Sequence, residues 1–94
     1  MKISEVKTTA KNVSLEAIVK GKGDVRDVNT RFGATRVSEC VIEDESGEII
    51  LVLWGDQIDF VKEGDRIRVE NAYVKEWQGK LQLNVGRSGK IEVV

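Results

Sequence analysis

The 94-residue chain contains no histidine, no proline and only one cysteine, and these absences exclude several classes of protein. Without histidine, a catalytic triad or an acid–base pair built on imidazole is impossible. Cys40 has no partner for an internal disulfide, and only carboxylates could join it at a zinc ion. We therefore expect no metal, no cofactor and no enzymatic activity, and Cys40 is predicted to be a small buried apolar residue.

Long apolar runs are missing as well. No segment approaches the roughly 20 apolar residues that span a bilayer, and no signal-peptide pattern opens the chain. The composition is 40% apolar and 33% charged, as in ordinary soluble domains, and the length suffices for one modest core. The sequence predicts a single intracellular domain over residues 1–94 with no membrane partner.

The net charge of −1 at first argues against nucleic-acid binding, because most nucleic-acid-binding domains are basic. The charges are unevenly distributed, however. Four acidic residues gather around one predicted turn: Glu43, Asp44, Glu45 and Glu48. Basic residues gather in the last third of the chain and beside an earlier loop: Lys75, Lys80, Arg87 and Lys90, with Arg31 and Arg36. This distribution is compatible with a positive face backed by a negative one.

Short alternating apolar segments separated by turn signals predict an all-β protein. Strands are expected over residues 13–20, 35–43, 48–54, 66–74 and 80–85, with a short final strand at 90–94 after a turn at Ser88 and Gly89. Gly21 and Gly23 indicate a break or bulge, followed by an extended segment at 25–28 and a loop at 29–34. A helical turn or lid is expected at residues 2–6. One short helix after Asp56 completes the pattern of a five-stranded Greek-key OB-fold barrel with one short helix between strands 3 and 4.

The segment from Tyr73 to Gly86 carries the clearest functional pattern. It is expected to form two strands that meet near Gln78 and Gly79, with side chains alternating between two faces. One face of the returning strand is a core, formed by Leu81, Leu83 and Val85. The other faces carry two aromatics, two lysines and two amides: Tyr73, Lys75, Trp77, Lys80, Gln82 and Asn84. Such faces suit a surface on which bases stack while cations meet phosphates.

Five segments in order resemble the OB-fold DNA-binding domains of archaeal single-stranded DNA-binding proteins and of replication protein A. They are SECVIEDESG (38–47), LVLWG (51–55), VKEGD (61–65), ENAY (70–73) and QGKLQLNVG (78–86), and the opening ISEV (3–6) also fits. The resemblance covers essentially the whole chain. It implies that single-stranded DNA lies across strands two to five, in replication, repair or recombination, in the nucleoid-associated part of the cytoplasm.

The chain departs from that family in two respects. The long glycine- and arginine-rich or acidic tail of one-domain archaeal members is missing, and so is the zinc ribbon of some replication protein A domains. The chain is either a minimal version or one domain of a longer multi-domain protein, and we favour the second. The resemblance then implies other subunits or domains of a replication protein A-like assembly as partners.

The resemblance also implies roles for individual residues. Trp54, Tyr73 and Trp77 match the family's base-stacking aromatics, although Trp54 ends the most apolar strand, so that a core or rim position remains open for it. Phe32 is expected either to cap bound bases or to pin its loop to the barrel, and Phe60 is expected to plug the barrel. Candidates for phosphate and polar contacts are Arg31, Arg36, Lys75, Lys80, Gln82, Asn84 and Arg87, with an ordinary surface position as the alternative for each.

Two other functions fit the same fold. In a protein–protein interaction module for subunit assembly, the three aromatics Trp54, Tyr73 and Trp77 would form an apolar patch for a partner. In an RNA- or tRNA-binding appendage of an enzyme, the same surface would bind RNA instead of DNA. Comparison of DNA with RNA oligomers, and the salt dependence of binding, separates these alternatives.

The sequence generates one direct prediction, on Trp77. Its replacement by alanine should weaken binding of single-stranded DNA by about 1–3 kcal/mol, because that is the contribution of one stacked base. Fluorescence anisotropy of a labelled oligomer measures the loss, and thermal melting of the variant is the control. A collapse of the melting temperature would mean that Trp77 is a core residue.

Overall fold

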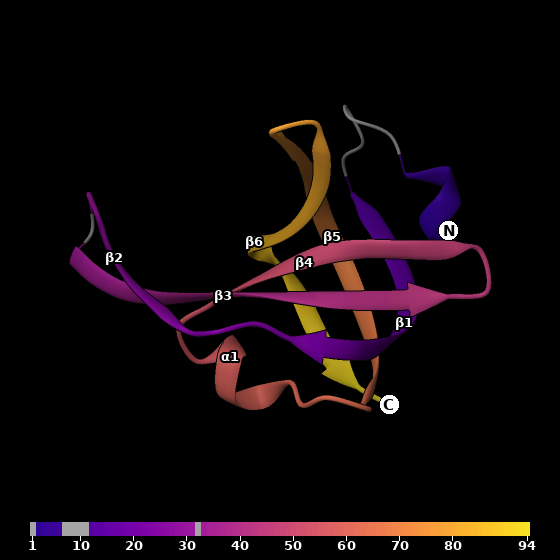
Figure 1. Ribbon diagram of the computed structural model, residues 1–94, viewed down its shortest axis with the longest axis horizontal. Coiled ribbons are helices and arrows are strands. Elements are labelled where there is room, and N and C mark those ends of the chain that lie inside the picture. Colours follow the sequence, from indigo (N-terminus) through magenta and orange to yellow (C-terminus); the bar gives the residue numbers. More distant parts are fainter. Residues whose placement is uncertain (1, 7–11, 32) are drawn as a thin grey trace.

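The computed structural model is a curved sheet closed into a small barrel, from which a two-stranded arm extends (Figure 1). It describes residues 2–6, 12–31 and 33–94, and for residues 77 and 86–88 the backbone alone. Phe32 lies outside the described residues. The elements in chain order are a 3₁₀ turn η1 (Ile3–Glu5), β1 (Val13–Lys22), β2 (Arg26–Thr30), β3 (Gly33–Asp44), β4 (Gly47–Trp54), α1 (Gln57–Phe60), β5 (Arg66–Trp77) and β6 (Lys80–Val93).

The strand order confirms the predicted OB-fold barrel. Neighbouring strands follow the order β1-β5-β6-β4-β3-β2, and β1 also pairs with β3, so that five strands close on themselves. The first half of β1 pairs with β5 and its end pairs with β3, with a bulge between Val19 and Gly21. All these pairs are antiparallel except β4 with β6, which run parallel. The bulge lies where the two glycines predicted it.

Alternating apolar residues of the strands fill the barrel. In β1, the four residues Val13, Leu15, Ala17 and Val19 are buried, and the residues between them are exposed. Cys40 is 1% exposed within the same core, and burial raises the pKa of its thiol to about 11. The prediction that Cys40 acts as a small apolar core residue is confirmed.

The two ends of the barrel are closed by different elements. At one end η1 places Ile3 against the core, and the Ile3 backbone N–H donates to Asp44 Oδ2 at 2.9 Å. At the other end Ile58 of α1 and the following Val61 are buried, whereas Phe60 is 53% exposed. The prediction that Phe60 plugs the barrel is therefore wrong. In so short a helix, Ile58 and Val61 occupy the one face turned inward, because side chains three positions apart lie on the same side.

Four strands are longer than the sequence predicted, because residues typical of turns have other roles in them. The expected loop at 29–34 is the tip of a hairpin arm in which Thr30 pairs with Gly33. The strand expected at 66–74 continues to Trp77, which is the last residue of β5 and pairs with Lys80. The expected turn at Ser88 and Gly89 lies inside β6, which is continuous to Val93. Gly89 is needed there because an added Cβ would lie 2.8 Å from the backbone oxygen of Glu70 and 2.9 Å from that of Asn71.

No helix in the described parts of the chain is long and apolar enough to cross a membrane.

Gly89→Ala should lower the free energy of unfolding by about 1–3 kcal/mol, because the new methyl group meets backbone atoms of β5 that cannot turn aside. Gly21→Ala is the matched control: it also lies in a strand beside a bulge, but nothing is within 4 Å of its added Cβ. Urea denaturation of both variants measures the difference. Equal stability of the two variants would contradict the close approach of β5 and β6 at Gly89.

Candidate nucleic-acid interface

The side chains that alternate away from the core on β3, β4, β6 and β5 form one surface, which we call the outer face. Register partners carry their side chains on the same side of a sheet. Val37 of β3 lies opposite Trp54 of β4, and Val52 of β4 lies beside Asn84 of β6. Asn84 in turn lies opposite Tyr73, and Gln82 lies opposite Lys75. The outer face comprises Val37, Glu39, Val41, Ile50, Val52, Trp54, Tyr73, Lys75, Gln82 and Asn84.

Two large aromatic side chains are presented on the outer face. Trp54 and Tyr73 are each 38% exposed, although the strands around them are largely buried. The open question of whether Trp54 is a core residue is therefore answered in favour of the surface. The Trp54 backbone N–H donates to Gln57 Oε1 at 3.0 Å, so the start of α1 anchors the end of β4. The two rings come from strands on opposite sides of β6 and share one face with it.

The backbone register extends this row to the end of the β5–β6 hairpin, where Trp77 pairs with Lys80. The side chains of Trp77 and Arg87 lie outside what the structure describes, as does Phe32 as a whole. Their predicted contacts with DNA remain predictions. The backbone of Trp77 nevertheless continues the pairing of Tyr73 and Lys75 with β6 in unbroken register.

The predicted basic residues divide into those on the outer face and those elsewhere. The Lys75 ammonium lies 5.8 Å from the centroid of the Tyr73 ring, within the range of a cation–π contact, and its side chain is exposed. Arg36 alternates to the other side of β3, where its guanidinium lies 3.0 Å from Asp59 of α1. Arg31 is exposed at the tip of the arm. The structure thus brings Lys75, but not Arg36 or Arg31, beside the Tyr73 ring on the outer face.

Sequence reasoning missed an ion pair on the rim of the outer face. Arg26 of β2 lies 3.3 Å from Glu39 of β3, so the arm places a cation against the carboxylate that the outer face carries. In the pairing of β2 with β3, Arg26 lies opposite Val37, and Glu39 is the next residue on the same side of β3. Only the fold of β2 onto β3 brings them together, and no local pattern signals it.

Asn84 differs from the exposed polar residue that the alternation pattern predicts. It lies on the outer face, yet it is 5% exposed, whereas its neighbour Gln82 is half-buried. The indole Nε1 of Trp54 donates a long hydrogen bond of 3.5 Å to Asn84 Oδ1. Asn84 lies between Val52 and Tyr73 in the sheet with the Trp54 indole beside it, and the alternation pattern of one strand does not convey such neighbours.

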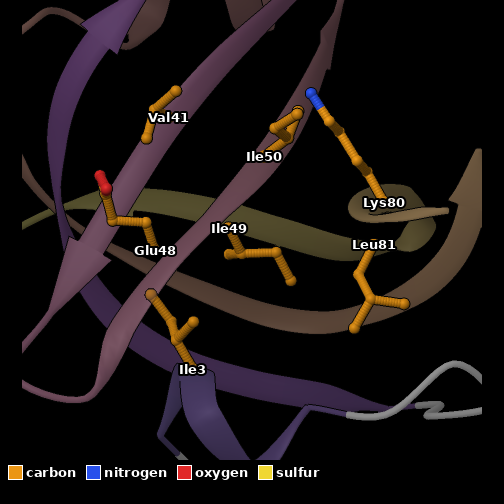
Figure 2. A pocket seen from close by; sticks show the side chains of 7 residues that line it. All are labelled: Ile3, Val41, Glu48, Ile49, Ile50, Lys80 and Leu81. Carbon is orange, nitrogen blue, oxygen red and sulfur yellow. The ribbon is translucent and has the colours of Figure 1, made fainter. Parts of the chain in front are cut away.

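A hollow of about 340 Å³ lies at the end of the outer face beside the β5–β6 hairpin (Figure 2). Ile50 and Val41 belong both to this hollow and to the outer face, and Lys80 stands at its edge in Figure 2. Its walls are mostly apolar, with Ile3, Glu48, Ile49 and Leu81 as the remaining lining residues. The hollow places the predicted cation Lys80 beside apolar surface that is continuous with the outer face.

Comparison with known proteins identifies relatives of the whole chain. A family described as "Single-stranded DNA binding protein Ssb-like, OB fold" matches residues 2–93. The single-stranded DNA-binding protein Ssb of Saccharolobus solfataricus is 32% identical over 90 residues, which are 96% of this chain. The matched region is 61% of that relative, so the chain spans less than two thirds of the relative's length.

Solved structures share the fold over the full chain. The OB domain of a Thermoplasma acidophilum protein has a TM-score of 0.87 at 29% identity, with 85% of that chain covered. The second OB-fold domain of replication protein A from Methanococcus maripaludis has a TM-score of 0.81 at 26% identity, with 93% of that chain covered. A replication factor A-related protein from Methanobacterium thermoautotrophicum, at 23% identity and a TM-score of 0.83, has the same fold, with 89% of it covered.

Proposed function

The chain belongs to the Ssb-like OB-fold family of single-stranded DNA-binding proteins, and on that basis we propose that it binds single-stranded DNA across its outer face. The observation that carries the proposal is the pair of exposed rings, Trp54 and Tyr73, that share this face with Lys75. An aromatic ring accepts any base, since every base has a π-face, so binding tolerates sequence. The protein acts by binding alone, as a non-enzymatic domain.

The proposed mechanism combines stacking with phosphate contacts. Each base stacked on Trp54, Tyr73 or Trp77 contributes about 1–3 kcal/mol. The lysines Lys75 and Lys80 contact phosphates, and so do Arg87 and the arm residue Arg31. Arg36 does so once it leaves Asp59, while Gln82 and Asn84 supply hydrogen bonds and Phe32 caps the bound bases. Duplex DNA binds poorly, because its paired bases hide the faces that the rings need.

The length of the bound strand follows from the size of the fold. One OB-fold covers about 4–16 nucleotides, and a single domain of this size takes the lower half of that range. If the chain is one domain of a longer protein, linkage to further domains raises its affinity through effective concentration. Replication, repair and recombination, which expose single strands, are the processes that such a domain serves in the nucleoid.

The first test is a titration of tryptophan fluorescence with a thymidine oligomer of about a dozen nucleotides, at low and moderate salt. Stacking on Trp54 should quench its emission, and added salt should weaken binding with a slope of about −0.7 per neutralised phosphate. RNA of equal sequence is the comparison for an RNA-binding appendage. Unchanged fluorescence with both polymers, together with self-association that is insensitive to salt, would favour the protein-interaction module instead.

A second test isolates the charge beside the rings. Lys75→Gln should make the salt slope less steep by about 0.7, because one phosphate contact is lost. Lys62→Gln makes the same change of charge in the connection between α1 and β5, away from the outer face, and should leave the slope unaltered. Titrations at four salt concentrations measure both slopes. Equal effects of the two substitutions would indicate a general charge effect rather than a contact made by Lys75.

A further inference from the structure

Asn84 is an unusual residue for the centre of a binding surface. It is 95% buried, and none of the described residues accepts a hydrogen bond from its Nδ2 atom. A buried donor without an acceptor lowers stability, and most buried polar groups avoid that state. Ser38, buried on the other side of β3, shows the usual arrangement, because its hydroxyl donates to the Gly23 carbonyl at 2.9 Å.

The orientation of the Asn84 amide is fixed by its neighbour. The indole nitrogen of Trp54 is a donor only, so the Asn84 atom that lies 3.5 Å from it must be the oxygen. The amide nitrogen, with its two hydrogens, is left for another partner. The indole occupies one of the two lone pairs of the Asn84 oxygen, whereas the amide nitrogen has no partner among the described residues.

The surroundings of Asn84 place that donor among the proposed stacking groups. Its register partners are Val52 on β4 and Tyr73 on β5. Val52 has no polar side-chain atom, whereas Trp54 and Tyr73 are both partly exposed. Rotation of the Tyr73 ring as it stacks on a base would open the space beside Asn84 without movement of the backbone.

We propose that Trp54, Tyr73 and Asn84 form a nucleobase subsite in which Asn84 Nδ2 donates to the carbonyl oxygen of a base in single-stranded DNA. This inference rests on the proposed function above and adds a base preference to it. Thymine, cytosine and guanine carry such a carbonyl, and adenine does not. The two-bond pairing of an asparagine with adenine also requires the side-chain oxygen, to which the Trp54 indole already donates. The subsite therefore favours a base with a carbonyl oxygen over adenine, whose only acceptors are ring nitrogens.

The test compares a thymidine oligomer with a deoxyadenosine oligomer of equal length at one salt concentration. Asn84→Leu, of similar size, should lower the ratio of thymidine to adenosine affinity by about three- to tenfold, as expected for one lost hydrogen bond. The variant should melt at a temperature no lower than the parent, because it removes an unsatisfied buried donor. Ser38→Ala, which removes a buried hydroxyl that does have a partner, should melt at a lower temperature.

A second variant tests the role of the indole nitrogen. Trp54→Phe keeps an aromatic ring but removes the indole donor from Asn84 Oδ1, which favours the two-bond pairing with adenine. The smaller ring weakens the binding of both oligomers to a similar degree, so this effect cancels in the ratio of their affinities. The ratio should therefore shift toward adenosine in this variant as well.

Measurement on the unaltered protein keeps the inference testable if a variant fails to fold. The side-chain amide resonances of Asn84 should shift on addition of the thymidine oligomer and respond less to the adenosine oligomer. Equal responses, or affinity ratios that no substitution changes, would overturn the subsite while leaving single-strand binding intact. Failure of the unaltered protein to bind either oligomer would remove the proposed function, and the subsite with it.

Discussion

Closure of the sheet through β1 is the constraint on which the rest of the structure depends. The first half of β1 pairs with β5, and its end pairs with β3. The bulge between Val19 and Gly21 lets β1 bend from one partner strand to the other. Closure gives every central strand one face in the core and one outside. Trp54, Asn84 and Tyr73 share a surface because their strands are held side by side in this register.

Residues whose alternation is strict were placed correctly by the sequence. Val13 to Val19 in β1 alternate between core and solvent as expected, and the Gly21 signal marked the bulge. Gly89 was predicted to lie in a turn. Glycine is typical both of turns and of places where two backbones approach closely, and the sequence alone does not distinguish them. Phe60 was misplaced because a four-residue helix has too few turns to show which side faces inward.

The sequence predicted which side chains of β5 and β6 share a face, but not how deeply each is buried. Period-two alternation put Tyr73, Lys75, Gln82 and Asn84 on one side, as the register shows. The contact of Trp54 with Asn84, and the ion pair of Arg36 with Asp59, join residues from different elements. Such contacts depend on how the barrel closes. Alternation along one strand carries no information about them.

The double pairing of β1 also sets the order in which the protein can be completed during synthesis. β1 is synthesised early, but Val13 cannot pair with Ala72 until β5 has been synthesised. The barrel closes only after β6 has followed. Until then the apolar face and the unpaired edge of β1 are both open to other chains. With partners so distant along the chain, loop closure limits the rate at which the domain folds. The nascent domain is thus most prone to aggregate before β5 is made.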